Sequence, residues 1–336
     1  MALTKYLGRK LAWTIVVFFV ALVLNFLLPR LIPGNPVDAI VGQIAAGGGA
    51  GGEQLQKIHE HYMQEFGLDK PLWEQFFIYV GRVLRGDFGT SFGSYPASVN
   101  HLVGQALPWT IAIQLPAIIV GWVIGNVLGA LAAFKGGWLD RGAFVGSLFF
   151  SSVPPFAFAI ILLFVVAVKG GILPVGGAYS FGLSPELSLT FFGDAITYFW
   201  LPFWSLVLVF IGTQAVGMRS MAVYELGTDY VNYNRGLGVR DGFTIRYIFR
   251  NAMLPQFTGL GLAIAGLITG GLITELVFSY PGLGTLLFNA IGQNDYPVIQ
   301  AITLLITLAV LLANFTVDVL TGFIDPRIRA AQSGER

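Results

Sequence analysis

Residues 225–240 read ELGTDYVNYNRGLGVR, and residues 246–255 read RYIFRNAMLP. The two stretches make up most of a polar, arginine-bearing segment, residues 219–254, which long apolar stretches flank on both sides. Such flanks are typical of membrane-spanning helices, each of which needs roughly 20 apolar residues. The segment is therefore expected to face water between two membrane helices.

The first part of this segment predicts a short helix. Thr228 or Asp229 can cap its start, and Gly238 can end it in the left-handed backbone conformation. Three large side chains then fall at positions i, i+3 and i+7 on one face: Tyr230, Tyr233 and Leu237. We expect this short aromatic helix to project from the membrane.

The second part predicts another helix, from near Asp241 to just before Pro255. One side of it is apolar, and another side carries two arginines four residues apart. The apolar side holds Ile245, Ile248, Phe249, Ala252 and Met253, and the basic side holds Arg246 and Arg250. We expect an interfacial helix that anchors to lipid headgroups.

The composition indicates a membrane protein. Apolar residues make up 55% of the sequence and charged residues only 11%, against roughly 25% charged in soluble proteins. The mean hydropathy is +0.73. The formal net charge of +1 gives no indication of a nucleic-acid partner, and none is expected.

Residue types that hold metals are scarce. The chain has no cysteine, so disulfides and thiolate metal sites are excluded. Its three histidines, His59, His61 and His101, fall in one polar region. His59 and His61 are two residues apart, which points them to different faces of a helix. We expect no metal and no cofactor.

Stretches of about the length that crosses a bilayer predict an all-α membrane protein with six transmembrane helices. They cover residues 11–29, 108–134, 142–168, 195–218, 256–278 and 298–323. The first follows basic residues, as the core of a signal peptide would, but it ends in Leu28-Pro29-Arg30 and lacks a cleavage site of small residues. We interpret it as an uncleaved anchor.

Basic residues predict the orientation of the chain. With both termini in the cytoplasm, 13 of the 19 lysines and arginines lie inside and 6 lie outside, as the positive-inside rule favours. The inside residues are Lys5, Arg9, Lys10, Lys135, Arg141, Arg219, Arg235, Arg240, Arg246, Arg250, Arg327, Arg329 and Arg336; the outside residues are Arg30, Lys57, Lys70, Arg82, Arg85 and Lys169. The segment 219–254 is then cytoplasmic.

This topology divides the chain into four parts. Residues 1–29 form the cytoplasmic N-terminus and first transmembrane helix, and residues 30–107 form an extracytoplasmic insert between helices 1 and 2. A five-helix transmembrane core, residues 108–323, contains the cytoplasmic loop 219–254, and residues 324–336 form a cytoplasmic tail. Within the insert, a flexible glycine tract precedes a helix expected over residues 53–66.

Strings along nearly the whole chain resemble one transporter family. The segment 225–255 is similar to D-Y-V-x-x-A-x-x-x-G-L followed by R-N-A-x-x-P, which is typical of the cytoplasmic coupling loop in permease subunits of binding-protein-dependent ABC importers, in the dipeptide/oligopeptide branch. Matching strings occur in the branch's order at residues 33–36 (PGNP), 67–72 (GLDKPL), 86–91 (GDFGTS), 275–284 (ELVFSYPGLG), 295–297 (DYP) and 325–329 (DPRIR). Asn35 replaces the branch's usual aspartate.

The resemblance implies a type I ABC importer permease fold in the cytoplasmic membrane of a prokaryote. It implies four partners: a second homologous permease subunit, two ATPase subunits and an extracytoplasmic solute-binding protein. The residues implied in coupling to the ATPase are Asp229, Tyr230, Tyr233, Arg235, Gly238 and Arg240. The wider loop signature begins Glu-Ala-Ala, and that glutamate is absent here, which leaves open the main polar contact to the ATPase.

Polar residues within the apolar stretches are candidates for lining a solute path, because such residues face a bundle interior or an aqueous route. We expect Gln114, Asn126 and Gln214 to line the path, with interhelical hydrogen bonding as the alternative. Glu275, Asn314 and Asp318 are further polar residues at depth. Gly121, Gly125 and Gly129 form a stripe on which another helix can pack closely.

The sequence leaves alternatives open for the solute that is carried and for the class of protein. The branch carries short peptides most often, but some members import plant-derived oligosaccharides. An ion-coupled secondary transporter would show an internal repeat, and none is evident. An intramembrane hydrolase would need a base within the bilayer, but all three histidines lie outside the apolar stretches. The chain also lacks the G-x-x-x-x-G-K-[ST] phosphate loop, so we expect partner subunits to hydrolyse ATP.

Overall fold

The computed structural model describes residues 2–31, 37–38, 41–42, 45, 52–65 and 67–324. Within these residues the secondary structure is helical, apart from one isolated bridge between Thr90 and Ser98. Among the described residues, five helices are long and apolar enough to cross a membrane, or six if one bent pair forms a single span. The prediction of an all-α membrane protein is confirmed.

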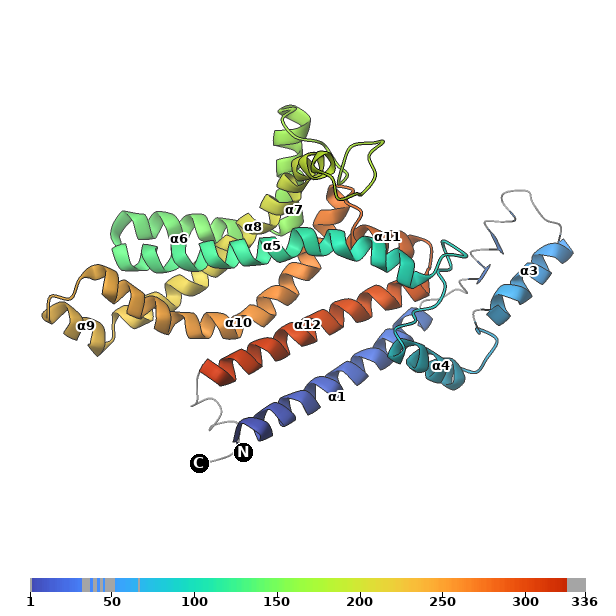
Figure 1. Ribbon diagram of the computed structural model, residues 1–336, viewed down its shortest axis with the longest axis horizontal. Helices are drawn as coiled ribbons and strands as arrows, with labels where there is room; N and C mark the ends of the chain where they lie inside the picture. The colour runs from blue at the N-terminus through green and yellow to red at the C-terminus, as the bar shows by residue number, and fades with distance from the viewer. Residues whose placement is uncertain are drawn as a thin grey trace. The chain divides into compact units, whose positions relative to one another are not determined.

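The helices are drawn in chain order in Figure 1. They are α1 (Ala2–Arg30), α3 (Gly52–Glu65), α4 (Leu72–Leu84), α5 (Val99–Lys135), α6 (Gly137–Ser152), α7 (Pro155–Leu162), the π-helix η1 (Leu163–Lys169), α8 (Leu189–Leu226), α9 (Asp229–Gly236), α10 (Asp241–Val277), α11 (Leu283–Gly292) and α12 (Tyr296–Ile324). The helix expected over residues 53–66 corresponds to α3. The glycine tract before it and the strings at 33–36 and 325–329 lie largely or wholly outside the described residues.

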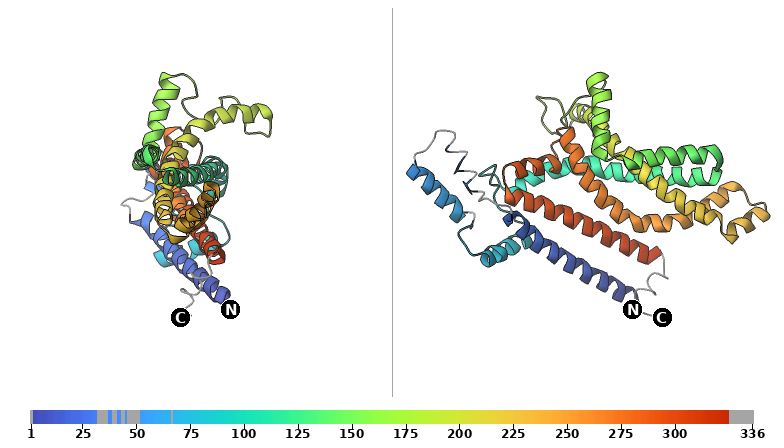
Figure 2. Two further views of the ribbon diagram at one scale, coloured as in Figure 1. Left: turned by 90° about the vertical axis from the view of Figure 1, so that its left-hand side faces the viewer. Right: turned by 180° about the vertical axis from the view of Figure 1, so that it is seen from behind.

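The chain forms two compact units. The larger unit comprises Met1–Leu11, Trp109–Gly284 and Leu312–Arg336, and the smaller unit comprises Ala12–Pro108 and Thr285–Leu311. In the larger unit α6 and α10 pack against α8. Ala130 of α5 packs with Met218 of α8 and Ala252 of α10, and α9 lies at the far end of α8 and α10 (Figures 1 and 2).

The glycine stripe of α5 packs against α8. A Cβ atom added at Gly125 would lie 2.6 Å from the Cβ of Gln214 and 2.7 Å from the carbonyl oxygen of Ile211. Gly121 and Gly129 meet α8 equally closely. Small residues allow this approach, which supplies the dispersion contacts that hold helices together in lipid. The prediction of a packing stripe is confirmed.

The third predicted span is not one kinked helix. The chain turns by 96° between α6 and the α7–η1 helix, at Val153 and Pro154. Val153 is extended, as a residue before proline prefers to be, and Pro155 stands in the first turn of α7. The consecutive prolines therefore break the stretch 142–168, which was predicted as one transmembrane helix, into two helices.

The helix expected to end before Pro255 is also different, because α10 runs without interruption from Asp241 to Val277. Ala252 and Met253, just before the proline, are buried against Ala130 and Met218. Proline removes one backbone hydrogen bond, and packing on both sides of it holds the helix together. The separate interfacial helix is therefore a wrong prediction, although its apolar side is buried and its two arginines are exposed as expected.

In the smaller unit one buried carboxylate joins a loop to the start of α12. Asp295 is 2% exposed and accepts hydrogen bonds from the Ser91 hydroxyl and from the backbone amides of Phe92 and Gly93. The same carboxylate accepts from the amide of Val298 in the first turn of α12, where a negative charge is favourable. The hydrogen bonds of Asp295 thus hold the loop at residues 91–93 against the first turn of α12.

Candidate functional site

The candidate site is the connection between α8 and α10. The chain leaves α8 at Leu226, passes Thr228 in an extended conformation and enters α9 at Asp229. Thr228 occupies the capping position, but its hydroxyl donates back to the Glu225 carbonyl and does not cap the helix. The expected side-chain cap is therefore absent from the described contacts at Thr228, whereas the predicted start of the helix is correct.

Gly238 ends α9 as the sequence predicts. Its φ is +69°, a conformation that costs a residue with a side chain roughly 1–2 kcal/mol. The amide of Gly238 donates to the Arg235 carbonyl at 3.1 Å, and the amide of Val239 donates to the Asn234 carbonyl at 3.0 Å. This pair of bonds is the Schellman motif, which satisfies the last carbonyls of the helix.

Val231 fixes α9 to the rest of the larger unit. It has no exposed surface and packs with Ala133 of α5, Ala222 of α8 and Ile248 of α10. Tyr230 on the expected aromatic face is half-buried, whereas Tyr233 and Leu237 are more than 60% exposed. Sequence reasoning missed Val231, although an aliphatic residue in a polar helix is a signal for a buried contact.

Glu225 is the second residue that sequence reasoning missed. Its carboxylate accepts a hydrogen bond from the Tyr230 hydroxyl at 2.8 Å and from the side-chain amide of Asn251 at 3.4 Å. It therefore ties α9 to both α8 and α10. Burial, together with the hydrogen bond to Glu225, raises the pKa of the Tyr230 hydroxyl, so the hydroxyl stays protonated and keeps donating.

The six predicted coupling residues divide into two groups. Tyr230 faces inward and holds the helix, as described above. The other five are exposed: Asp229, Tyr233, Arg235, Gly238 and Arg240. The result is a projecting helix that exposes the ring of Tyr233 and the guanidinium group of Arg235, with a second exposed guanidinium group at Arg240 just before α10. Aromatic residues and arginine are enriched at protein interfaces, so this surface suits a protein partner.

The three predicted path residues are all buried within the larger unit. Gln114 of α5 donates to the Glu275 carboxylate of α10 at 3.4 Å. Asn126 donates to the Trp122 carbonyl one turn earlier, and its own buried carbonyl oxygen has no hydrogen-bond partner among the described residues. Gln214 lies where α8 meets Gly125. The bond from Gln114 joins two helices, whereas the bond from Asn126 stays within α5.

Glu275 is the centre of a buried polar cluster. It is 1% exposed and accepts from the backbone amide of Gly284 at 2.7 Å, besides the bond from Gln114. Thr110 hydrogen-bonds the same carboxylate and accepts from the Leu283 amide at 2.8 Å. The cluster therefore joins α5 and α10 to the turn before α11.

Asp318 of α12 has a partner near the start of the chain. Lys10 forms an ion pair with its carboxylate at 2.9 Å, and the Tyr6 hydroxyl donates to its backbone carbonyl at 3.0 Å. Asn314, one turn earlier, lies directly over Gly261 of α10. These two polar residues of α12 thus contact α1 and α10.

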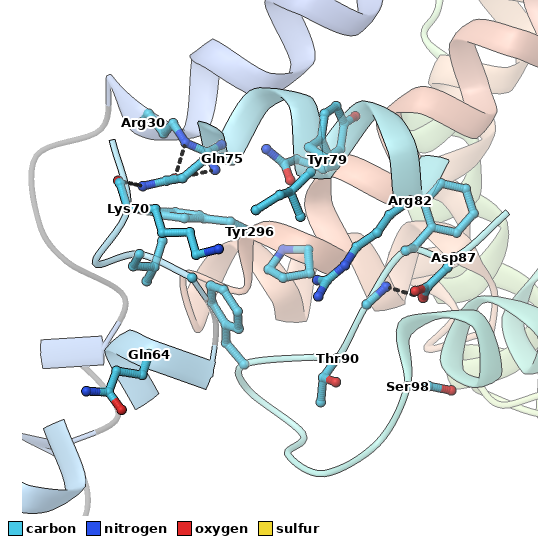
Figure 3. A pocket seen from close by; sticks show the side chains of 18 residues that line it. Arg30, Gln64, Lys70, Gln75, Tyr79, Arg82, Asp87, Thr90, Ser98 and Tyr296 are labelled. Atoms are coloured by element: carbon cyan, nitrogen blue, oxygen red, sulfur yellow. Dashed lines mark hydrogen bonds between the residues drawn. The ribbon is translucent and has the colours of Figure 1, made fainter. Parts of the chain in front are cut away.

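The smaller unit contains a cavity of about 390 Å³ with three basic residues in its lining, which Figure 3 shows: Arg30, Lys70 and Arg82. Arg30 donates to the Gln75 side chain and to the Phe26 carbonyl, and its burial lowers the pKa of the guanidinium to about 10. Lys70 pairs with Glu74 at 2.9 Å. Spacing along the sequence gave no indication of this cavity.

The long apolar helices packed through glycines indicate a multi-pass membrane protein, and the docked, exposed helix α9 between two of them suits contact with a partner protein. The chain belongs to the family of binding-protein-dependent transport system inner membrane components, which matches residues 125–330. This range contains α9 and most of the membrane helices, but not α3 or α4.

Named relatives resemble the chain over almost its whole length. It is 33% identical to the di/tripeptide transport system permease protein DppB of Pseudomonas aeruginosa, over 97% of this chain and 98% of that protein. It is 30% identical to the dipeptide transport system permease protein DppB of Lactococcus lactis, covering 97% and 100%. It is 32% identical to the glutathione transport system permease protein GsiC of Escherichia coli K12, covering 97% and 99%.

Proposed function

We propose that this chain is one of two permease subunits that form the translocation path of an ATP-driven importer for short peptides. The observation that carries the proposal is α9, which is docked by Val231, ended by Gly238 and exposed at Tyr233. It projects from a chain of a binding-protein-dependent transport family. A short helix held at both ends can transmit a push from an ATPase into α8 and α10.

Short peptides are the solute that the relatives favour. The three relatives named above are dipeptide, di/tripeptide and glutathione permeases. Glutathione is itself a tripeptide, so all three names describe solutes of one chemical class. This supports short peptides over plant-derived oligosaccharides for the present chain, and membership of this family favours the ABC importer over an ion-coupled secondary transporter.

The binding protein of the system offers a direct test of the solute. We expect the solute-binding protein encoded beside this permease to bind di- and tripeptides in a calorimetric titration and to leave oligosaccharides unbound. Proteoliposomes holding both permeases and both ATPase subunits should then take up the bound peptide only with ATP inside and binding protein outside. Binding of an oligosaccharide alone would replace the peptide assignment while leaving the importer assignment in place.

The proposed assembly follows the sequence interpretation. A second homologous permease and two ATPase subunits complete the importer, and a solute-binding protein docks on the extracytoplasmic side. We propose that residues 1–29 and 108–323 form the type I permease bundle, that residues 30–107 form the extracytoplasmic insert, and that residues 324–336 are a cytoplasmic tail. Both termini and α9 then lie in the cytoplasm, where the 13 basic residues favour them.

Cysteine labelling tests this orientation, because the chain has no cysteine of its own. Ser94→Cys should react with a membrane-impermeant maleimide on intact cells, whereas Gly242→Cys should react only after the cells are opened. Both positions are exposed, and a side chain at Gly242 meets open space. Thr244, although nearby, is 2% exposed and would report burial in place of topology. The reverse labelling pattern would move α9 to the wrong side for an ATPase.

Leucine substitutions test whether Gln114, Asn126 and Gln214 line the path. If they do, Gln114→Leu, Asn126→Leu and Gln214→Leu should each lower peptide uptake without lowering the melting temperature of the purified complex. If they bridge helices, the melting temperature should fall, because such a hydrogen bond contributes about 0.6 to 2 kcal/mol. Normal uptake with lowered stability would remove a residue from the path. Because Gln114 donates a hydrogen bond to Glu275, we expect Gln114→Leu to lower the melting temperature most of the three variants.

A further inference from the structure

Helix α4 has one strongly apolar, exposed face. Trp73, Phe77, Val80 and Leu84 follow one another at i, i+4, i+7 and i+11, within about 60° of each other on a helix of 3.6 residues per turn. Trp73 is 66% exposed, Phe77 67% and Leu84 76%. A soluble surface helix would bury such a stripe, so the stripe of α4 needs an apolar environment that the described residues do not supply.

The opposite face of α4 is polar. Gln75 and Arg82 lie there, roughly 180° around the helix from the stripe. Both line the cavity of Figure 3, in which the Arg82 side chain points toward the loop that follows the helix. The helix therefore separates a polar cavity with basic residues in its lining from an apolar stripe.

Contacts with α1 show which way the stripe faces. The ring of Phe26 packs on Phe76 and Tyr79, with centroids 5.2 and 5.6 Å apart. One turn further along α1, and past the end of its apolar span at Leu27, Arg30 donates to Gln75. Toward the outer end of α1, the residue of α4 that α1 contacts thus changes from Phe76 to Gln75. This change is a rotation of about 100° around the axis of α4, in the direction away from the stripe.

The stripe must therefore face in the opposite direction along α1, toward the depth at which the apolar span of α1 lies. Helix α4 crosses α1 and does not run alongside it, as Figures 1 and 2 show within the smaller unit. The crossing occurs where α1 ends its apolar span, between Phe26 and Arg30. This is the depth of lipid headgroups, where tryptophan is enriched and arginine reaches outward.

We propose that α4 lies in the surface of the lipid bilayer, with Trp73, Phe77, Val80 and Leu84 inserted at the boundary between headgroups and acyl chains. Its polar face, with Arg82, points to water. The helix anchors the segment between α1 and α5 to the membrane surface. It also keeps the basic cavity on the water side of the lipid. The occupant of the stripe is lipid, because α4 packs on the end of the apolar span of α1, a span that is itself only 11% buried.

Quenching by brominated lipid tests the insertion. In the complete importer, with the other subunits free of reactive cysteines, Phe77→Cys and Leu84→Cys are labelled with bimane and reconstituted in phosphatidylcholine nanodiscs. The matched control is Arg82→Cys, an exposed position on the polar face of the same helix. Bromines on acyl carbons near the headgroup should reduce bimane emission at positions 77 and 84, and leave position 82 close to its emission in unbrominated lipid.

Three results would overturn the proposal. Unquenched, blue-shifted emission at both stripe positions would mean that a partner subunit covers α4. Unquenched emission typical of water would mean that the stripe is solvated. Equal quenching at positions 77 and 82 would mean that α4 does not have the orientation that its contacts with α1 define. Two labelled stripe positions keep the test valid if one cysteine variant fails to assemble.

Discussion

Gly238→Val should uncouple ATP hydrolysis from the binding protein. Valine resists the φ of +69° that Gly238 adopts, so the two hydrogen bonds that end α9 would be lost or strained. A penalty of roughly 1–2 kcal/mol or more corresponds to at least about a fivefold change in the population of the docked helix. We expect ATPase stimulation by peptide-loaded binding protein to fall by at least that factor.

Gly227→Val is the matched control for this experiment. Gly227 borders α9 on its other side, but its φ is −83°, which valine can adopt, and the nearest atom to an added Cβ is the Tyr224 carbonyl oxygen at 3.6 Å. Stimulation should stay near wild type in this variant, and both variants should insert in the membrane normally. Wild-type stimulation in Gly238→Val would remove the helix stop from the coupling mechanism.

Gly125→Val should produce the largest loss of stability. The added side chain would meet the Cβ of Gln214 and the carbonyl of Ile211 at under 3 Å, and backbone cannot move aside as a flexible side chain can. Overpacking of this kind costs typically 1–3 kcal/mol and sometimes more. The melting temperature of the purified complex should fall by several degrees, and the assembled yield should fall with it.

Gly104→Val separates packing from helix propensity. Gly104 lies in the same helix, α5, but an added Cβ there meets nothing within 4 Å. The two substitutions carry the same cost of a β-branched residue in a helix, so any difference in melting temperature measures the contact with α8. Equal melting temperatures would show that α5 and α8 do not pack as closely as the glycine stripe indicates.

Local features were predictable from the sequence because their causes are local. Gly238 follows a short polar helix at a position whose left-handed backbone conformation favours glycine. The i, i+4 spacing of Gly125 and Gly129 indicates a packing stripe even when the partner helix is not known. The break at Pro154 also has a local cause, because a proline removes a backbone hydrogen bond and the residue before it avoids the helical conformation.

Features that depend on distant residues were not predictable. Glu225 holds α9 by accepting from Tyr230 and connects it to α10 by accepting from Asn251, 26 residues away. The course of α10 through Pro255 depends on burial beside it, against residues of α5 and α8, and no pattern within the helix reveals this. The cavity bounded by Arg30 and Arg82 likewise forms only when segments about 50 residues apart come together.

The carboxylate of Asp295 gives the smaller unit a mechanical property. It holds the loop at Ser91 and the first turn of α12 at the same time, so neither can shift alone without breaking hydrogen bonds at a buried charge. Within the smaller unit, a displacement of this loop would therefore carry the start of α12 with it, so that the two segments move as one piece.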